Sequence, residues 1–296
     1  MILGYQETAK VMGVTATLTV HDKDAPHLVQ VGNDLLTNYE RLWSRFLPHS
    51  DITRLNNANG AVVKVDPETS QLVATMIAAH RETHGLFNPT LLPMQMSHGD
   101  SKSLVSDAVC STSDAVHPWE DLDGITFHSP TSLSIPKQMT LDAGGMAKGF
   151  AADRVALALI QLGASSVSVN IGGDARVMAS DESTHDWNFD VCDTQGTHIW
   201  STVSLHEGAI ATSSMDARHR SGRGPTHHLF SIDNTPSDIA LCSVIAANAT
   251  WAEAWTKLLF FSTDLYNDIQ QRDLAVFIVD TQGNTYFSEK WKEYRL

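Results

Sequence analysis

The sequence predicts an α/β protein in which helices flank β-sheet. Alternating apolar residues, as in VMGVTATLTV at 11–20 and SSVSVNI at 165–171, are typical of strands. Apolar residues three and four apart, as at 27–46 and 147–162, are typical of amphipathic helices. A strand–helix–strand order around the second of these helices favours a helix that covers one face of a sheet.

The remaining elements follow from the same periodicities and from turn residues. A short turn after 44–50 is expected to be capped by Ser50 or Asp51. Residues 94–116 are polar and rich in serine, which predicts an irregular excursion. The other expected elements are helices at 67–83 and 250–260, strands at 125–127, 132–135, 187–192, 198–204, 208–212, 227–232 and 241–246, and a C-terminal hairpin at 274–291 that turns at 281–284.

Size and charge narrow the function classes. The 296 residues are enough for one large domain or for two closely associated lobes. The net charge of −14 argues against non-specific nucleic-acid binding, and an anionic ligand would need local cations. No run approaches the ~18 apolar residues of a membrane span, and no secretory leader pattern is present, so we expect a cytoplasmic protein.

The three cysteines do not indicate a metal site or a disulfide framework. Cys110, Cys192 and Cys242 are far apart, odd in number, and lack the close pairs typical of zinc sites. We interpret them as buried thiols.

The most informative stretch is LDAGGMAKGFAADR at 141–154, which opens the long predicted helix. Asp142 stands where an N-terminal cap is expected, and Lys148 adds a cation one turn into the helix. The glycines allow backbone to approach a ligand, and free N–H groups at a helix start favour anions. This pattern predicts a phosphate or diphosphate site, although an ordinary capped helix after a tight turn has the same features. Arg45 and Arg54 are further candidates for anion contact, or else surface arginines.

Seven segments in order resemble the ApbE family of FAD:protein FMN transferases. SVNIGGDA resembles the family's LVNLGGD, and LDAGGMAKGFAADR resembles LDLGGIAKGYAxDR. The other five segments are SRFLPHSDITRLN (44–56), HGLFNPT (84–90), AIATSS (209–214), HHLF (227–230) and ATWAEAWTKLLF (249–260).

The resemblance implies a T-fold-like architecture with a flavin cleft, and an enzyme that moves FMN from FAD to a Thr or Ser hydroxyl of an acceptor flavoprotein, releasing AMP. It also implies a magnesium ion at the diphosphate. A phosphoryl transfer of this kind needs an aligned hydroxyl and neutralised phosphate oxygens.

The resemblance also implies roles for individual residues. His228 matches the histidine that assists proton removal from the acceptor hydroxyl, a role that suits a group with a pKa near neutrality. The implied metal-site residues are Gly145, through its carbonyl, Thr250 and Glu253. The implied cofactor-binding residues are Met12, Phe46, Leu86, Phe87, Asn88, Asp142, Lys148, Asn170, Gly172, Gly173, Asp174, Ala211, Thr212, Ser213 and Lys257.

Departures from the family pattern lie near the chemistry. Glu253 and Lys257 stand where the family has an aspartate and a threonine, and a protonated lysine has no lone pair for a metal. Glu253 and Lys257 have the spacing of a surface ion pair, and the ammonium of Lys257 is a candidate to replace part of the cation's role. Ser231 and Asn88 each replace a family aspartate.

Three functions therefore stay open at the level of sequence. The first is an FMN transferase with altered metal ligation. The second is a catalytically altered or inactive FAD-binding protein that acts as a carrier or sensor. The third is a diphosphatase that hydrolyses FAD to FMN and AMP.

Overall fold

The computed structural model describes residues 4–97, 118–215, 238–260 and 265–296. They fall into two compact units. The described residues of the first unit lie within 1–37, 148–219 and 236–296, and those of the second unit lie within 38–147. Each unit is described separately below. None of the helices in the described ranges has the length and hydropathy of a membrane-spanning segment.

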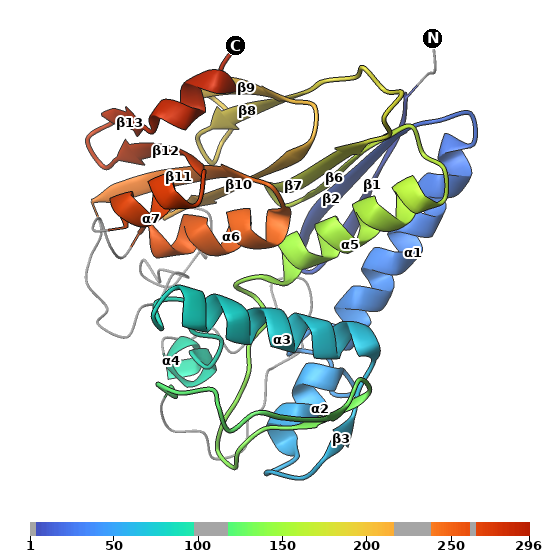
Figure 1. The fold of residues 1–296 in the computed structure, drawn as a ribbon, viewed down its shortest axis with the longest axis vertical. Helices are drawn as coiled ribbons and strands as arrows, with labels where there is room; N and C mark the ends of the chain where they lie inside the picture. The colour runs from blue at the N-terminus through green and yellow to red at the C-terminus, as the bar shows by residue number, and fades with distance from the viewer. Residues whose placement is uncertain (1–3, 98–117, 216–237, 261–264) are drawn as a thin grey trace. The chain divides into compact units, whose positions relative to one another are not determined.

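An eight-stranded sheet forms the centre of the first unit (Figure 1). All neighbouring strands pair antiparallel. In spatial order the strands are β1 (Gly4–Val11), β2 (Val14–His21), β6 (Ser166–Ile171), β7 (Asp174–Ala179), β10 (Gly208–Ser214), β11 (Ile239–Ala246), β12 (Ala275–Asp280) and β13 (Thr285–Phe287).

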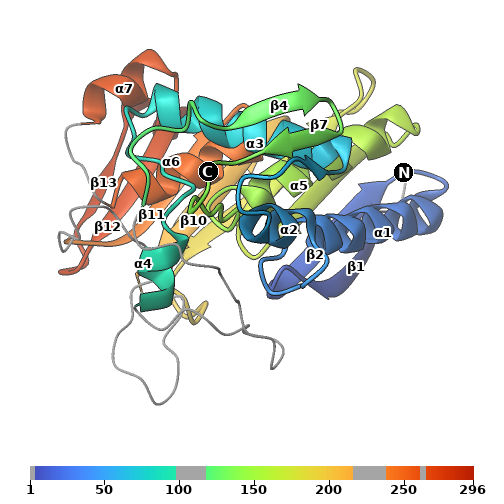
Figure 2. The same ribbon diagram turned by 90° about the horizontal axis from the view of Figure 1, so that it is seen from below.

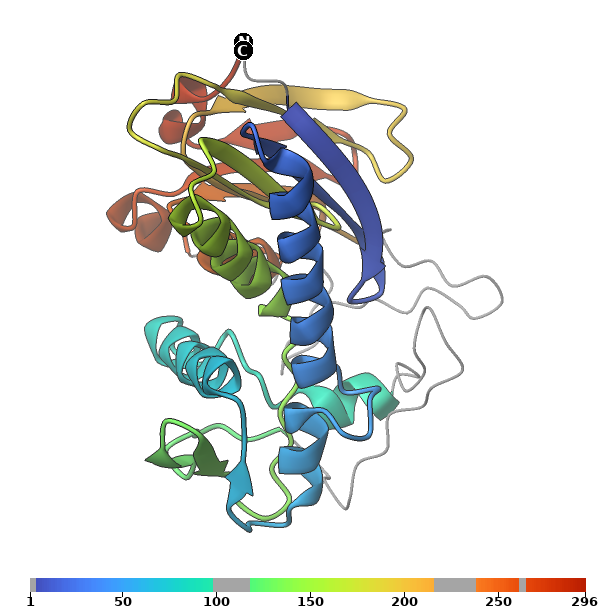
Figure 3. The same cartoon turned by 90° about the vertical axis from the view of Figure 1, so that its right-hand side faces the viewer.

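Helices cover one face of this sheet. Helix α6 (Ala249–Leu258) packs against β7, β10 and β11. Helix α5 (Ala147–Gln161) lies beside the N-terminal part of α1 (Ala25–Trp43), as Figure 3 shows. Gly32 of α1 permits this packing, because a Cβ there would lie 2.4 Å from Leu18 and 3.3 Å from Val155. A further short helix, α7 (Tyr266–Gln271), precedes β12.

A two-stranded hairpin and a 3-10 helix cover the opposite face. The hairpin is β8 (Trp187–Cys192) with β9 (Ile199–Leu205), and the 3-10 helix is η1 (Glu289–Glu293). Their side chains join an apolar core with the sheet, in which Trp291 is fully buried. Side chains alternate along a strand, so Ile210, which lies in this core, and Ser213, which contacts α6, point to opposite faces of β10.

The second unit holds a small sheet, in the order β3 (Val63–Lys64), β5 (Ser132–Ser134) and β4 (Thr126–Ser129), together with three helices (Figure 2). The helices are α2 (Asp51–Asn57), α3 (Pro67–Glu82) and α4 (Leu92–Ser97). The Asp51 carboxylate accepts hydrogen bonds from Asp66 N and Thr69 Oγ1 at 2.7 and 2.8 Å, which joins α2 to the start of α3.

The predicted α/β class is confirmed, and most predicted elements lie within two residues of the observed ones. Ser50 caps α2 through a 3.1 Å bond from Thr53 N, as predicted. The strand predicted at 11–20 is observed as β2 from Val14 onward. Its predicted start is wrong, because Val11 ends β1 and Met12 and Gly13 adopt positive φ and turn the chain between the two strands. The C-terminal hairpin also ends early, since η1 follows β13.

Two further predictions need correction near the ends of elements. Asp142 does not cap α5, which begins five positions later at Ala147; its Oδ1 accepts a bond from Gly144 N in the preceding turn. The irregular excursion predicted at 94–116 begins with the end of α4, and residues 98–117 lie outside the described part of the chain. The strand predicted at 227–232 also lies outside it.

Candidate functional site

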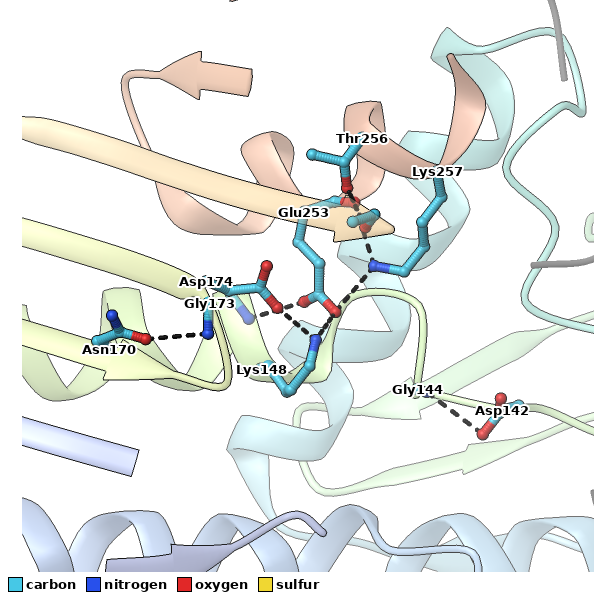
Figure 4. A network of polar contacts seen from close by, with 11 residues as sticks. Asp142, Gly144, Lys148, Asn170, Gly173, Asp174, Glu253, Thr256 and Lys257 are labelled. Carbon is cyan, nitrogen blue, oxygen red and sulfur yellow. Dashed lines mark hydrogen bonds and ion pairs between the residues drawn. The ribbon is translucent and has the colours of Figure 1, made fainter. Parts of the chain in front are cut away.

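A buried cluster of four charged side chains lies where α5 and α6 approach β7 (Figure 4). Lys148, in the first turn of α5, contacts the carboxylates of both Asp174 and Glu253 through its ammonium. Lys257 contributes a second ammonium, 3.0 Å from Glu253 Oε1. We call Lys148, Asp174, Glu253 and Lys257 the ionic cluster. Its formal charges sum to zero.

Glu253 is the centre of the ionic cluster. Its side chain is 0% exposed, and its Oε1 receives both ammonium groups. Its Oε2 accepts a 2.8 Å hydrogen bond from Gly149 N at the start of α5. The expectation of free N–H groups at this helix start is therefore wrong for Gly149, because an internal carboxylate takes that donor.

The environment shifts the pKa values of the cluster in opposite directions. Burial alone would raise the pKa of Glu253, but the ammoniums of Lys148 and Lys257 outweigh it and lower the pKa to about 2. Burial opposes the charge of Lys148, yet the two carboxylates raise its pKa above the ordinary value. Lys148 and Glu253 are therefore both charged at neutral pH. Burial lowers the pKa of Lys257, against the pull of Glu253.

A close approach of two helix starts holds these groups in place. A Cβ at Gly149 would lie 2.2 Å from the carbonyl oxygen of Ala249 and 2.8 Å from Thr250 N. Only glycine allows α5 to approach the backbone of α6 this closely. The contact brings Glu253, one turn into α6, within reach of Lys148.

Asp153 fixes the start of α6 from the neighbouring helix. Its carboxylate accepts bonds from Ala249 N at 2.8 Å, from Thr250 N at 2.9 Å and from Thr250 Oγ1 at 2.5 Å. Arg176 Nε lies 3.5 Å from the same carboxylate. Sequence reasoning did not identify Asp153 or Arg176, and no local pattern indicates a partner 97 residues away.

A glycine turn lies beside the ionic cluster. Gly172 and Gly173 have φ of 65° and 102°, so the chain reverses between β6 and β7 immediately before Asp174. Asn170 Oδ1 accepts a 3.0 Å bond from Gly173 N and stabilises the turn. A Cβ at Gly172 would lie 2.8 Å from Val14, so the turn also packs tightly against β2.

A cavity of about 470 Å³ opens on the hairpin-covered face of the sheet. Four residues predicted to bind the cofactor line it, namely Asn170, Gly172, Gly173 and Thr212. The other residues that line the cavity include Phe189, Asp190 and Cys192, and the sequence analysis did not identify them. Asp174 pairs directly with Ala211 across the sheet and therefore points to the opposite, helix-covered face.

The predicted residues on β10 make hydroxyl contacts on both faces of the sheet. Thr212 Oγ1 lies 2.7 Å from Ser243 Oγ, and Ser213 Oγ lies 2.8 Å from Thr256 Oγ1 of α6. Ala211 is fully buried. Ser213 therefore belongs with α6 and the ionic cluster, whereas Thr212 belongs with the cavity. Met12 lies in the turn between β1 and β2, in the same unit.

In the second unit, Asp142 is paired with Arg45. Arg45 Nη1 lies 3.2 Å from Asp142 Oδ2, and the Arg45 side chain is buried whereas that of Asp142 is 11% exposed. Arg45 is thus neither a surface arginine nor a free anion contact. Its guanidinium also lies over the ring of Phe46, 4.9 Å from the centroid. Arg54 is paired with Asp51 at 2.8 Å.

The neighbouring segment 86–90 is organised by Asn88. Its Oδ1 accepts bonds from Thr90 N and Thr90 Oγ1 at 2.9 and 2.7 Å, and its Nδ2 donates to Trp119 O at 2.8 Å. Phe87 is buried, whereas Leu86 is 40% exposed. Gly145 lies in the turn before α5. His228 lies outside the described residues, so its catalytic role stays a prediction.

The residues around Glu253 do not fit a magnesium ion in this arrangement. Magnesium requires about six oxygen ligands in octahedral geometry at ~2.1 Å. Both Glu253 oxygens accept N–H donors, and two ammonium groups contact its Oε1, so a divalent cation there would lie beside two positive charges. In the described part of the chain, no group of three or more His, Cys, Asp or Glu side chains is arranged to hold a metal.

The fold and site define an α/β protein with a buried ionic cluster on one face of the large sheet, a cavity on the other face, and a glycine turn between them. The sequence profile of the ApbE family matches residues 12–277, and the chain belongs to this family. The chain is 25% identical over 272 residues to a protein of Klebsiella pneumoniae named FAD:protein FMN transferase, covering 86% of this chain and 82% of that one. A protein of the same name from Haemophilus influenzae is 21% identical over 280 residues, covering 88% and 80%.

Solved structures show the same fold. An ApbE protein from Thermotoga maritima superposes with a TM-score of 0.86 at 20% identity, covering 99% of this chain and 100% of that one. The flavin transferase ApbE from Vibrio cholerae superposes with a TM-score of 0.77 at 18% identity, covering 99% of each chain. The T-fold-like ApbE architecture implied by the sequence resemblance is confirmed.

Proposed function

We propose that this chain is a flavin transferase. In this proposal it binds FAD and transfers the FMN part to a Ser or Thr hydroxyl of an acceptor protein, releasing AMP. Membership of the ApbE family over residues 12–277 supports the proposal, as do two relatives named FAD:protein FMN transferase. The observation that carries it is the pair of ammonium groups beside the Gly172–Gly173 turn, within that family's fold.

The ammonium groups still have capacity for an anion. Each lysine ammonium has three N–H donors. The contacts of Lys148 with Asp174 and Glu253 use two, and those of Lys257 with Glu253 Oε1 and Glu253 O use two. Counting the contacts among the described residues alone, each lysine has one N–H donor left for a phosphate oxygen.

The cavity has a size and lining suited to part of a nucleotide. Its volume of about 470 Å³ lies in the range of small-molecule sites, roughly 300–1,000 Å³. Asn170 and Thr212 offer polar groups that orient a ligand, and Phe189 and Ile210 offer apolar surface. The cavity and the two lysines lie on opposite faces of the sheet, and Asp174, which contacts Lys148, directly follows the Gly172–Gly173 turn that lines the cavity. We propose that FAD passes over this turn, with one part in the cavity and its diphosphate facing Lys148 and Lys257.

The proposed transfer is a displacement at phosphorus. The acceptor oxygen forms a bond to the phosphorus of the FMN part, and the bond from that phosphorus to the bridging oxygen breaks. AMP leaves with the bridging oxygen, and the hydroxyl proton passes to a base, for which we propose His228. Positive charge from the two lysines would stabilise the negative charge that develops on the phosphate oxygens.

Mass spectrometry tests this proposal. The protein is incubated with FAD, magnesium and an acceptor that carries a threonine flavinylation motif, with a Thr→Val acceptor as control. The proposal predicts covalent FMN on the threonine acceptor alone, with an equal amount of AMP. Release of AMP without an adduct would instead support FAD hydrolysis. Bound FAD with neither product would support a carrier or sensor.

A further inference from the structure

The Glu253–Lys257 pair differs from an ordinary ion pair on a helix surface. Its i, i+4 spacing is common on exposed helix faces, where solvent screens the charges. Here the Glu253 side chain is fully buried and that of Lys257 is 20% exposed. The pair is also joined to Lys148 and Asp174, so it belongs to a closed network and not to a solvated face.

The network occupies three of the roughly four acceptor sites of the carboxylate that a metal would need. Glu253 Oε1 receives both ammonium groups, and Oε2 receives the Gly149 N–H. Lys257 also donates to the carbonyl oxygen of Glu253 at 3.2 Å, which fixes its ammonium over the first turns of α6. A divalent cation at Glu253 would displace these donors and lie beside two positive charges in a buried site.

We propose that the ammonium of Lys257 takes the place of a divalent cation beside Glu253, so that Lys148 and Lys257 together neutralise the anionic substrate. The identity of that anion as a diphosphate rests on the function proposed above. The inference that no divalent cation is resident at Glu253 does not depend on the proposed function. It is argued from the contacts of Glu253 alone. Lys257 is thereby assigned a substrate-binding role that the family pattern at this position lacks.

Manganese binding tests the proposal without any assay of activity. Mn²⁺ is titrated into the purified full-length protein and the free ion is measured by electron paramagnetic resonance, first without nucleotide and then with FAD. Without nucleotide, the wild-type protein is expected to bind no stoichiometric Mn²⁺. With FAD present, the free Mn²⁺ concentration is expected to fall no further than it does in a solution of FAD without protein. One bound Mn²⁺ per wild-type chain that is lost in Glu253→Gln would overturn the proposal.

Replacement of the lysine provides the converse test. Lys257→Thr restores a neutral oxygen ligand and removes one ammonium, and we expect Mn²⁺ affinity to rise about tenfold or more. Lys23→Thr removes a lysine at an exposed turn of the same unit and is expected to change nothing. The double variant Glu253→Gln/Lys257→Thr is expected to lose the gain. If circular dichroism shows that Lys257→Thr is folded, and this variant binds no more Mn²⁺ than wild type, then Lys257 does not exclude the metal.

The substrate part of the proposal has its own readout. FAD affinity of the wild-type protein, measured by fluorescence quenching, is expected to be unchanged by EDTA, and Lys257→Met is expected to weaken it about tenfold. A loss of FAD affinity with EDTA would overturn the proposal. Absence of FAD binding under all conditions would refute the proposed function and the binding role of Lys257, while the manganese result would still decide whether Glu253 holds a cation.

Discussion

The ammonium of Lys257 lies 3.0 Å from the carboxylate of Glu253, and this carboxylate has no exposed surface. The helical spacing of the two residues predicts an ion pair, but the sequence cannot show that the pair is buried. Burial changes the energetic role of this ion pair. A buried carboxylate is stable in its charged form only beside cations, so Lys148 and Lys257 are needed to stabilise Glu253, unlike lysines in exposed surface pairs.

Lys148→Met is expected to destabilise the fold strongly. It leaves Asp174 and Glu253 close together with only Lys257 to offset them, and removal of one partner from a buried ionic network costs about 3–5 kcal/mol. Urea denaturation at pH 7 measures the change in the free energy of unfolding. Lys23→Met, at an exposed position, serves as the control. A loss below about 1 kcal/mol would mean that Lys148 is not integral to the network.

Gly149→Ala is expected to disturb the contact between α5 and α6. The added Cβ would lie 2.2 Å from the carbonyl oxygen of Ala249, and backbone cannot yield as a flexible side chain can. We expect a loss of about 1–3 kcal/mol or more in the free energy of unfolding, together with weaker FAD binding. Leu157→Ala, on the exposed side of the same helix, controls for general effects on α5. Wild-type stability in Gly149→Ala would show that the helices do not approach this closely.

Cys192 and Cys242 are expected to differ in their reactivity toward alkylating reagents. Cys242 is buried in β11, and burial raises the pKa of its thiol, so the reactive thiolate is scarce. Cys192 is half-buried and lies in the cavity wall. Iodoacetamide at pH 8, followed by peptide mapping, should label Cys192 and spare Cys242 until urea is added. Labelling of Cys242 in the native protein at the rate of Cys192 would contradict the packing of β11.

Local patterns account for much of what the sequence predicts correctly. The apolar spacing identifies α1, α3 and α6, and the Ser50 side chain identifies the start of α2. Each of these features depends on residues within a few positions of one another. The hairpin turn at Met12 escapes prediction, because a methionine at positive φ has no distinctive turn signature.

Long-range contacts account for what the sequence does not predict. Lys148 and Glu253 are 105 positions apart, so their contact depends on how α5 and α6 pack on the sheet. The same holds for Asp153, which caps a helix 97 positions later. The residue types of the site and the Glu253–Lys257 pair could be predicted from the sequence, but the contacts of Lys148 with Asp174 and Glu253 could not. The ionic cluster shows that Lys148 serves two internal carboxylates as well as any ligand.

Isothermal titration calorimetry of FAD into the wild-type protein tests the central claim most directly. The account predicts one FAD bound per chain, with affinity weakened about tenfold or more in Lys148→Met and unchanged in Lys23→Met. Circular dichroism at the titration temperature confirms that each variant is folded. Absence of binding heat with the wild-type protein across several temperatures, or equal FAD affinity in wild type and folded Lys148→Met, would contradict a nucleotide site at the start of α5.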